Sequence, residues 1–205
     1  MTNVSIDRAG RGPFDAALLD SMFRLRHDVF HSRLGWQVTI QDGREHDWFD
    51  VLGPYYVVAH DHGNPRRSVG CCRLLPTTGP NMLRDVFPFL ADGATIPVQP
   101  DVWEISRFAV DSAHSCGAFG FGDVPAAMLR AVVEFAVRRR ATALVGVTSA
   151  PLERMLRHLG FKVERLGRPR RIGNVMSLAF RLPLDDAVVR AVCAAEGSVS
   201  LRIAA

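Results

Sequence analysis

The sequence predicts a three-layer α-β-α sandwich around a mixed sheet, of the α/β or α+β class. Two strand-like segments follow one another early in the chain, whereas the later strands alternate with helical segments that can cross over the sheet. The 205 residues are enough to bury a full core, and no repeat, low-complexity tract or linker-like change of composition divides them. We therefore expect a single domain over residues 1–205.

The first expected elements are a helix and two strands. The helix is expected over residues 13–25, because Pro13 suits its first turn and apolar residues recur at helical spacing. Residues 55–60 and 68–75 are predicted as strands that form an antiparallel hairpin. The proline- and glycine-rich segment 76–101 is expected to be a long irregular loop, a kind of segment that often carries function.

The middle of the chain contains a third strand, a glycine-rich loop and a longer helix. We expect the strand over residues 102–110 and the loop over residues 116–122. Asp123 is expected to cap the helix, because a carboxylate can accept hydrogen bonds from the first backbone N–H groups. Pro125 then stands in the first turn, where proline is tolerated.

The last expected elements are two strands separated by a short helix. Residues 142–148 and 174–182 are predicted as the strands. Ser149 is expected to cap the helix between them, and Gly160 to end it. This order of strands and helices resembles that of N-acyltransferase folds, but a fold alone does not assign a function.

The composition excludes several classes of protein. Hydrophobic residues make up 48% of the chain and charged residues 22%, which is typical of a globular protein. The apolar stretches are too short to cross a bilayer, and the first residues lack the features of a secretory signal. Four cysteines without Cys-x-x-Cys spacing argue against a disulfide framework or a zinc site. We therefore expect a cytoplasmic protein without a membrane-spanning segment.

The net charge of +4 is concentrated in two arginine-rich segments, residues 138–140 and 165–171. Such clusters attract an anionic partner, which can be a nucleic acid, an acidic protein or a phosphate group. A nucleic-acid-binding regulator is the less favoured interpretation, because the sequence has no helix-turn-helix, zinc spacing or aromatic-basic strand motif. We therefore expect no nucleic acid among its partners.

Three clusters combine charged and aromatic residues without helical or strand periodicity. They span residues 24–36, residues 45–50, and residues 73–76 together with 103–108. In residue type and spacing, the clusters resemble the hallmark residues of acyl-homoserine-lactone synthases, and the resemblance extends over about residues 20–180. The matching residues are Arg26, Phe30, Trp36, Asp47, Asp50, Arg73, Phe87, Glu104 and Arg107, followed by Val147-Thr148-Ser149 and Glu153-Arg154-Met155-Leu156.

The resemblance implies an acyltransferase with two substrates. One is S-adenosylmethionine, and the other is an acyl thioester carried by acyl carrier protein or coenzyme A. The enzyme would form an amide, close a lactone and release methylthioadenosine, without a metal or redox cofactor. The alternative is a coenzyme A-dependent N-acyltransferase that acts on another amine. Against it, the loop after residue 110 lacks an Arg/Gln-x-x-Gly-x-Gly pyrophosphate motif.

The charged residues of the motif have two interpretations. Asp47 and Asp50 can engage the substrate ammonium, or they can hold Arg26 and Arg73 in place. An arginine also offers two parallel donors to the substrate carboxylate. The other interpretation is a purely structural ion network, and the two are compatible because one network can both brace the fold and shape a pocket.

Glu104 is the expected general base and acts on the substrate amine through a water molecule. An α-ammonium has a pKa of about 7.7–8, so a mild base is sufficient. Glu104 and Arg107 would face opposite sides of a regular strand, because residues three apart do so. We therefore predict a β-bulge near Ser106, which would bring both residues to one side and free backbone N–H groups for an oxyanion.

Apolar and aromatic residues are assigned to substrate binding, with ordinary core packing as the alternative. Phe30 and Trp36 can hold the sulfonium cation against their rings. By resemblance, Thr148 accompanies acyl chains that carry a 3-oxo or 3-hydroxy group, although a buried hydroxyl also finds backbone partners easily. The remaining residues expected to bind substrate or to line an acyl tunnel are Phe87, Phe108, Met128, Leu129, Val145, Val147, Met155 and Leu156.

Arg154, Arg157 and Arg168 are expected to contribute to a docking surface for acyl carrier protein. Arg154 and Arg157 would lie on the polar side of the short helix, and Arg168 belongs to the arginine-rich segment that follows it. Acyl carrier protein is acidic, so a basic surface would attract it. The alternative is a solvated surface without a partner.

Overall fold

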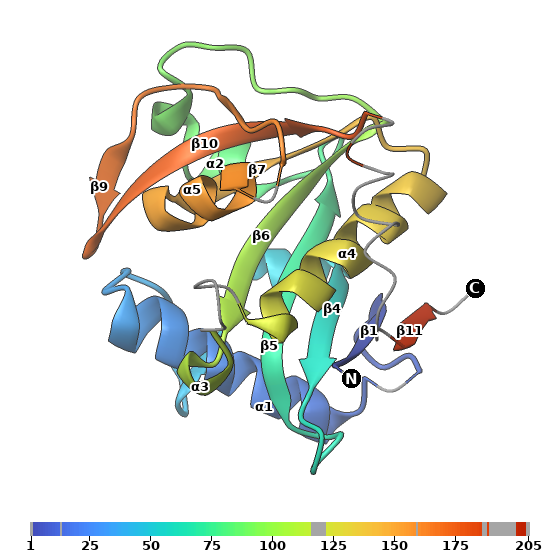
Figure 1. Cartoon of the computed structure of the whole chain (residues 1–205). Coiled ribbons are helices and arrows are strands. Elements are labelled where there is room, and N and C mark those ends of the chain that lie inside the picture. The colour runs from blue at the N-terminus through green and yellow to red at the C-terminus, as the bar shows by residue number, and fades with distance from the viewer. Residues whose placement is uncertain are drawn as a thin grey trace.

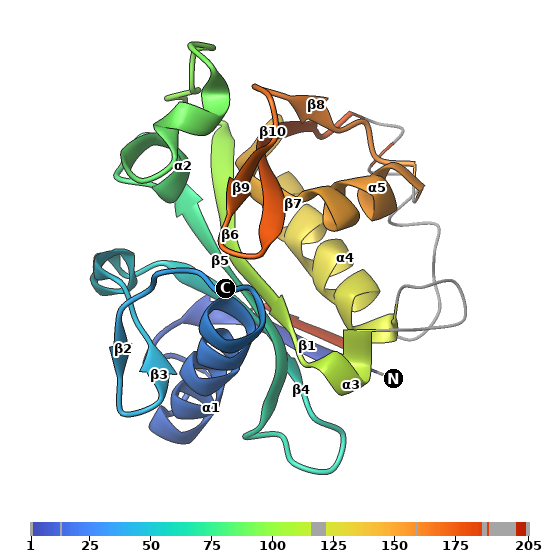
Figure 2. The ribbon, with the colours of Figure 1, turned by 90° about the vertical axis from the view of Figure 1, so that its left-hand side faces the viewer.

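The computed structural model describes residues 2–12, 14–115, 122–158, 160–185, 188 and 200–203. Within this part of the chain, a mixed sheet lies between two layers of helices (Figure 1). Figure 2 shows α1 and α2 on one side of the sheet and α4 and α5 on the other. The helical segments are α1 (Ala16–Arg26), the π-helical η1 (His27–Arg33), the 3-10 helix η2 (Trp48–Leu52), α2 (Met82–Asp85), the 3-10 helix η3 (Pro88–Ala91), α3 (Ser112–Ser115), α4 (Asp123–Arg138) and α5 (Ala150–His158). The predicted three-layer fold is confirmed.

The main sheet has the strand order β11-β1-β4-β5-β6-β7-β10-β8, and β9 pairs with β10 beside this path. The pairs β6–β7 and β1–β11 are parallel, and the other pairs are antiparallel. A separate hairpin joins β2 and β3. The strands are β1 (Asn3–Arg8), β2 (Ile40–Gln41), β3 (Arg44–Glu45), β4 (Tyr55–His60), β5 (Ser68–Pro76), β6 (Val102–Val110), β7 (Ala143–Ser149), β8 (Glu164–Arg165), β9 (Arg170–Ile172), β10 (Val175–Pro183) and β11 (Ser200–Ile203).

Most of the predicted strands and helices are present within a residue or two of their expected bounds. The expected hairpin is β4–β5, and the expected third strand is β6. α1 begins after Asp15, whose carboxylate accepts a hydrogen bond from the Leu18 backbone, whereas Pro13 lies outside the described residues. The prediction that Asp123 caps α4 was wrong by one residue, because Gly122 occupies the capping position and Asp123 is the first helical residue.

The segment 76–101 is not one irregular loop. It contains α2, which Asn81 caps by accepting a hydrogen bond from the Arg84 backbone, and the short helix η3. The short strands β1, β8 and β9 were also not expected. The hydroxyl of Ser149 accepts a hydrogen bond from the Leu152 backbone, as the expected cap requires. Most of the glycine-rich segment 116–122 lies outside the described residues.

Two irregularities of β6 shape the centre of the molecule. Cys71 pairs with Ala109 and Arg73 with Ser106, so that Cys72 alone lies opposite both Arg107 and Phe108. This is the predicted bulge, and Arg107 has a left-handed φ of 54°, as the first residue of a G1-type bulge does. On its other edge, β6 pairs with β7 only from Val102 to Ile105, although both strands continue. The two strands therefore diverge and leave an opening in the sheet.

Gly146 lies at the last paired position before β6 and β7 diverge. A Cβ atom at this position would lie closer than 3.0 Å to the carbonyl oxygen of Ile105, which real Cβ atoms essentially never do. Glycine therefore permits the close approach of the two backbones at the point where the sheet opens.

The hydrophobic core fills both sides of the sheet. One cluster packs α4 against the sheet, a second packs α1 against the opposite face, and a third lies beneath α2. Cys71 and Cys72 are buried free thiols, and burial raises the pKa of Cys71 to about 12, so these residues pack as apolar side chains. Cys116 and Cys193 lie outside the described residues. Among the described helices, none has the length and apolar character needed to cross a membrane.

The close approach at Gly146 gives a testable prediction. We expect Gly146→Ala to lower the free energy of unfolding by about 1–3 kcal/mol, because the added methyl group must push β6 and β7 apart. Gly63→Ala is the matched control, since a Cβ there meets its nearest atom at 3.7 Å, an ordinary contact. Urea denaturation of the two variants measures the difference, and equal stabilities would contradict the assigned role of Gly146.

Candidate active site

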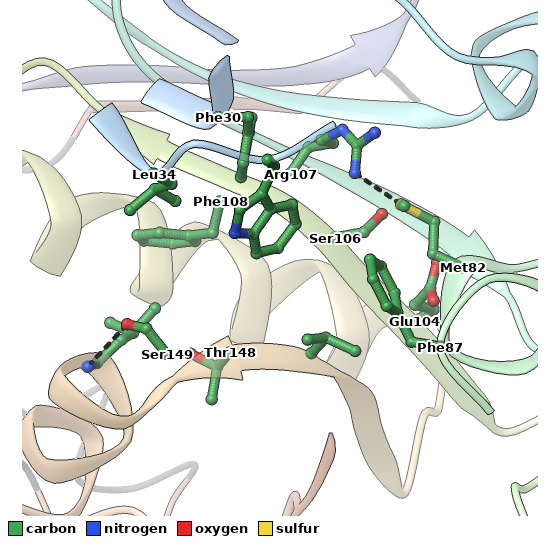
Figure 3. Close-up of a pocket in the computed structure, with 13 residues that line it drawn as sticks. Phe30, Leu34, Met82, Phe87, Glu104, Ser106, Arg107, Phe108, Thr148 and Ser149 are labelled. Carbon is green, nitrogen blue, oxygen red and sulfur yellow. Dashed lines mark hydrogen bonds between the residues drawn. The ribbon is translucent and has the colours of Figure 1, made fainter. Parts of the chain in front are cut away.

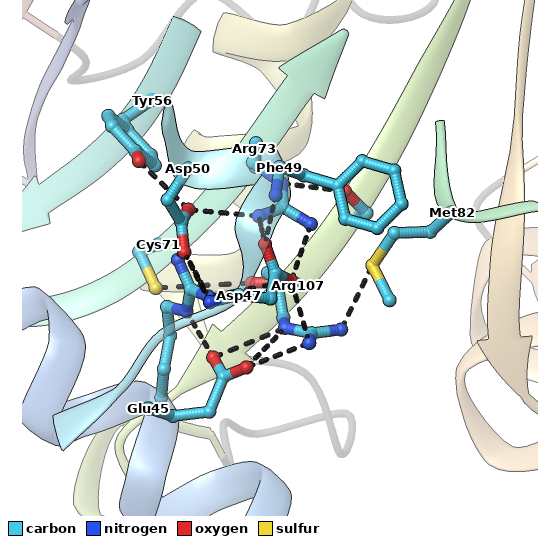
Figure 4. A network of polar contacts seen from close by, with 11 residues as sticks. Glu45, Asp47, Phe49, Asp50, Tyr56, Cys71, Arg73, Met82 and Arg107 are labelled. Carbon is cyan, nitrogen blue, oxygen red and sulfur yellow. Dashed lines mark hydrogen bonds and ion pairs between the residues drawn. The ribbon is translucent and has the colours of Figure 1, made fainter. Parts of the chain in front are cut away.

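A buried network of three arginines and three carboxylates lies on the α1 side of the sheet (Figure 4). The carboxylates stand on β3, at the start of η2 and within η2, while the arginines come from α1, β5 and β6. Three positive and three negative charges balance one another, which lowers the cost of burying them. The members are Arg26, Arg73, Arg107, Glu45, Asp47 and Asp50.

Arg26 and Arg73 are almost fully enclosed and hold the two aspartates in forked pairs. Arg26 donates to both oxygens of Asp50 at 2.8 and 2.9 Å and to Glu45 at 2.5 Å. Arg73 donates to both oxygens of Asp47 at 2.6 and 3.0 Å and to Asp50 at 2.9 Å. The guanidinium groups of Arg26 and Arg73 are therefore engaged by the protein itself, as the structural interpretation of the motif requires.

Glu45 completes the network and was not among the expected site residues. It accepts hydrogen bonds from Arg107 Nη2 at 2.7 Å and from Arg26, and its side chain is fully buried. The remaining donor group of Arg107, Nη1, is directed at the sulfur of Met82 at 3.0 Å, which is a weak acceptor. The sequence feature that could have identified Glu45 as a site residue is its position in the acidic segment 45–50, two residues before Asp47.

The network keeps the carboxylates of Glu45 and Asp50 ionised. Burial alone would raise the pKa of Glu45, but the charges of Arg26 and Arg107 hold it below the ordinary value. Burial also opposes ionisation of Asp50, yet Arg26 and Arg73 lower the pKa of that carboxyl strongly. Tyr56 donates to Asp50 at 2.9 Å, and its own pKa is raised by burial and by that negative charge.

Glu104 has a different environment from the carboxylates of the network. Its side chain is buried, and one oxygen accepts a hydrogen bond from the Leu83 backbone at 2.6 Å. The other oxygen has no hydrogen-bond partner within the described part of the chain. Burial raises the pKa of Glu104, against the opposing effects of the Leu83 and Met82 backbone N–H groups and of the Arg73 charge. A buried carboxyl with a raised pKa and a free oxygen is suited to accept a proton.

Glu104 lines a central cavity between β6, β7 and η1 (Figure 3). Figure 3 shows side chains from these elements around the same space, with Phe30 and Leu34 on one side and Thr148 and Ser149 on the other. The side chain of Glu104 therefore lies beside a space that can hold reacting groups.

Two further cavities adjoin the central one. An apolar cavity lies between the sheet and the helices α4 and α5, and the residues that it shares with the central cavity stand where β6 and β7 diverge. An outer cavity lies between η2 and α2 and shares Trp36, Met82, Phe87 and Arg107 with the central cavity. The shared residues at the diverging strands are Ser106, Phe108, Val147, Thr148 and Leu152.

Most of the predicted site residues come together around these cavities and the adjoining network. The central cavity is lined by the expected residues Phe30, Trp36, Phe87, Glu104, Arg107, Phe108, Val147 and Thr148. The hydroxyl of Thr148 is buried and has no hydrogen-bond partner in the described part of the chain, so the alternative of a backbone partner is not observed. Leu129 and Leu156 line the apolar cavity, as expected of tunnel residues.

Three of the residues expected in the tunnel lie elsewhere. Met128 is buried in the core under α4, where it packs against Gly70, and it lines none of the three cavities. Val145 belongs to the core cluster beneath α2. Met155 is half-buried on α5 and is also absent from the cavity walls. Helical and strand spacing alone could not separate core residues from cavity residues. Leu34, Ser106 and Leu152 do line cavities but were not among the expected substrate-binding residues.

The three arginines expected to dock a carrier protein are exposed. Arg157 is paired with the buried carboxylate of Glu153, which also binds Arg165. The backbone N–H of Arg168 donates to Asp92, and the side chain of Arg168 is exposed. Arg154 makes no ion pair within the described residues. The surface is therefore basic, although part of its charge is balanced internally.

The match to known proteins extends over most of the chain. The family model described as autoinducer synthase matches residues 14–192. An acyl-homoserine-lactone synthase from Pseudomonas aeruginosa is 38% identical over 175 residues, which cover 85% of this chain and 87% of that protein. One from Ralstonia solanacearum is 41% identical over 193 residues, covering 92% of this chain and 90% of the relative.

Solved structures agree with these sequence relationships. BjaI, a coenzyme A-dependent acyl-homoserine-lactone synthase solved with S-adenosylmethionine and isopentyl-CoA, superposes with a TM-score of 0.83 at 27% identity and covers 98% of this chain. That alignment covers 94% of the BjaI chain. A putative N-acetyltransferase from Lactobacillus plantarum, 16% identical, has a TM-score of 0.56 and shares the fold alone. The chain therefore belongs to the autoinducer synthase family, the acyltransferases that make acyl-homoserine lactones.

Proposed function

We propose that this enzyme transfers an acyl group from a thioester to the α-amine of S-adenosylmethionine and then closes the homoserine lactone with release of methylthioadenosine. The observation that carries the proposal is Glu104, a buried carboxylate with a free oxygen at the cavity that joins the outer and the apolar cavities. The structure of BjaI, a relative solved with S-adenosylmethionine and isopentyl-CoA, supports this arrangement of two substrates.

S-adenosylmethionine is assigned to the outer cavity and the adjoining part of the central cavity. Trp36 and Phe87 stand where these cavities meet, with ring centroids 5.8 Å apart, and aromatic faces attract a sulfonium cation. Asp47 also lines the outer cavity and is the most exposed carboxylate of the network, so it can attract the substrate ammonium. Arg107 Nη1, which otherwise contacts only a thioether sulfur, is suited to bind the substrate carboxylate.

Glu104 is assigned as the general base for amide formation. Its raised pKa is closer to that of the substrate ammonium than an ordinary carboxyl pKa would be, which favours proton transfer. Glu104 takes a proton from the ammonium, directly or through water, and the free amine attacks the thioester carbonyl carbon. Backbone N–H groups at the Arg107 bulge, where the ladder is interrupted, are suited to donate to the resulting oxyanion. The thiol then leaves as the amide forms.

Lactone formation needs little more than correct positioning. The carboxylate attacks its own γ-carbon, and the bond from that carbon to the sulfonium breaks to release methylthioadenosine. This step is an intramolecular closure of a five-membered ring, so holding the substrate folded lowers its barrier. The proposed sequence of steps requires neither a metal nor a redox cofactor.

The acyl chain is assigned to the apolar cavity, which it would reach through the opening between β6 and β7. Leu144, Phe161 and Phe180 line that cavity, and each methylene buried there contributes about 0.8 kcal/mol to binding. The unpartnered hydroxyl of Thr148 lies between the two cavities. It can donate a hydrogen bond to an oxygen at the third carbon, which supports a 3-oxo or 3-hydroxy chain.

The thioester donor is assigned as acyl carrier protein, docked on the surface formed by Arg154, Arg157 and Arg168. These exposed guanidinium groups suit an acidic protein, and the pairs of Arg157 and Arg165 with Glu153 hold α5 in place beside β8. Coenzyme A is the alternative donor. The Arg154→Glu variant distinguishes the two, because KM is measured for carrier-protein thioesters and for acyl-CoA. The enzyme is expected to act in the cytoplasm, where both donors and S-adenosylmethionine occur.

The first prediction concerns Glu104. We expect Glu104→Gln to slow amide formation by about 10²–10⁴-fold at neutral pH, because the amide side chain cannot accept the proton. The wild-type rate should rise as pH increases through the raised pKa of Glu104, whereas the variant rate should rise only as the substrate ammonium deprotonates near pH 8. The ratio of the wild-type rate to the variant rate should therefore become smaller at high pH. Acyl-S-adenosylmethionine formation measured across pH tests this, and a constant ratio would argue against a base.

The second prediction concerns Thr148. We expect Thr148→Val to lower kcat/KM for 3-oxoacyl thioesters by about 2- to 12-fold, while the value for unsubstituted chains is retained or rises. The hydroxyl supplies one hydrogen bond of about 0.5–1.5 kcal/mol, and valine has nearly the same shape. Competition between paired 3-oxoacyl and acyl thioesters of equal length measures the change. An unaltered ratio would remove Thr148 from substrate selection.

The third prediction concerns the docking surface. We expect Arg154→Glu to raise KM for acyl carrier protein thioesters by about tenfold, without changing KM for acyl-CoA or S-adenosylmethionine, because charge reversal repels an acidic partner. Added salt should reduce the difference. Arg138→Glu, at an exposed position in the last turn of α4, is the matched control with the same change of charge. Equal effects of the two variants would contradict a specific docking role.

A further inference from the structure

Trp48 is an exposed aromatic residue at the rim of the outer cavity. It is the first residue of η2, and its side chain is 51% exposed, whereas Trp103 is 8% exposed and Trp36 is half-buried. It is not one of the residues that carry the family resemblance. With Val86 it forms exposed apolar surface beside one cavity, and apolar surface at a groove is typical of ligand-binding sites.

The backbone of Trp48 is held firmly although its side chain is exposed. Asp47 caps η2 by accepting a hydrogen bond from the Phe49 backbone at 3.0 Å, and the Asp47 backbone in turn donates to Asp50 at 2.9 Å. The carboxylates of Asp47 and Asp50 are held by Arg73 and Arg26. The backbone on both sides of Trp48 is therefore anchored to the buried network, which places the residue at the rim of the cavity.

The surroundings of Trp48 suit a flat, apolar, aromatic group. Its ring lies against that of Phe49, with centroids 4.4 Å apart at 33°. Val86, from the end of α2, lines the same cavity and is itself 41% exposed. These two side chains come from different elements and leave apolar surface at the mouth of one cavity. The charged residues Asp47 and Arg107 line the same cavity, so its wall combines apolar and charged groups.

The outer cavity is apolar at its rim and charged further inside, and this arrangement matches the chemistry of S-adenosylmethionine. Its amino acid part carries an ammonium and a carboxylate, and its adenine is a flat heteroaromatic ring without a net charge. With the amino acid part directed toward Asp47, Arg107 and Glu104, the adenine is left at the rim. An indole is a strong stacking surface for a purine.

We propose that Trp48 is the adenine platform of this enzyme, and that the adenine of S-adenosylmethionine binds between Trp48 and Val86. The inference rests on the proposed function, because it takes S-adenosylmethionine as the substrate. Stacking strengthens binding of the adenosyl group and of the product methylthioadenosine. Stacking on Trp48 does not affect binding of the thioester or the proton-transfer step.

The test compares the binding of three ligands by isothermal titration calorimetry. They are S-adenosylmethionine, methylthioadenosine and S-methylmethionine, which has the sulfonium amino acid but no adenosine. We expect Trp48→Ala to weaken binding of the first two by about tenfold, from the typical strength of base stacking, and Trp48→Phe to restore much of the loss. S-methylmethionine should bind both forms equally. Val51→Ala is the matched control, since Val51 is 83% exposed on η2 but does not line the cavity.

Steady-state kinetics supply a second readout. Trp48→Ala should raise KM for S-adenosylmethionine and leave KM for the thioester unchanged. Equal affinity of Trp48→Ala and the wild type for methylthioadenosine would overturn the inference, as would an equal loss of S-methylmethionine affinity. A wild-type protein that binds neither S-adenosylmethionine nor methylthioadenosine would overturn the proposed function together with it.

Discussion

The buried ion network is the interaction on which the rest of the structure depends. It joins α1, β3, η2, β5 and β6 through side chains that could not be buried alone, because an isolated charge in the protein interior is strongly disfavoured. Removing one member of a buried ion pair typically costs about 3–5 kcal/mol, since its partner is left without a counter-charge. Arg107 belongs to the network and also lines the central cavity, so the same contacts that fix the fold define one wall of the site.

The irregular part of the sheet provides the space for chemistry. The bulge opposite Cys72 brings Glu104 and Arg107 to the wall of one cavity, and the divergence of β6 from β7 connects this cavity to the apolar one. A regular, fully paired sheet would have separated the central cavity from the apolar one. The bulge contains Arg107 in a left-handed conformation, and Gly146 permits the close approach of β6 and β7 at the last pair before they diverge.

Sequence patterns predicted the elements well where the signal is local. The strands over residues 55–60 and 102–110 follow from runs of apolar and β-branched residues, and the bulge follows from the spacing of two polar residues within a strand. The tunnel prediction was less accurate. Met128 and Leu129 are neighbours on α4 with the same apolar character, yet Met128 packs against Gly70 in the core and Leu129 lines the apolar cavity. That difference depends on the direction in which each side chain points.

The sequence by itself determined the order of the main strands and helices, the fold class and the family, because these depend on local periodicity and on motifs that can be compared in one dimension. Only the tertiary structure decided the electrostatic environment of each carboxylate. Glu45 and Glu104 are identical in chemistry, but Glu45 meets Arg107, 62 residues away, and stays ionised, whereas Glu104 keeps a free oxygen and a raised pKa. The physical reason is that the pKa of a buried group depends on the charges and donors that folding brings to it from distant parts of the chain.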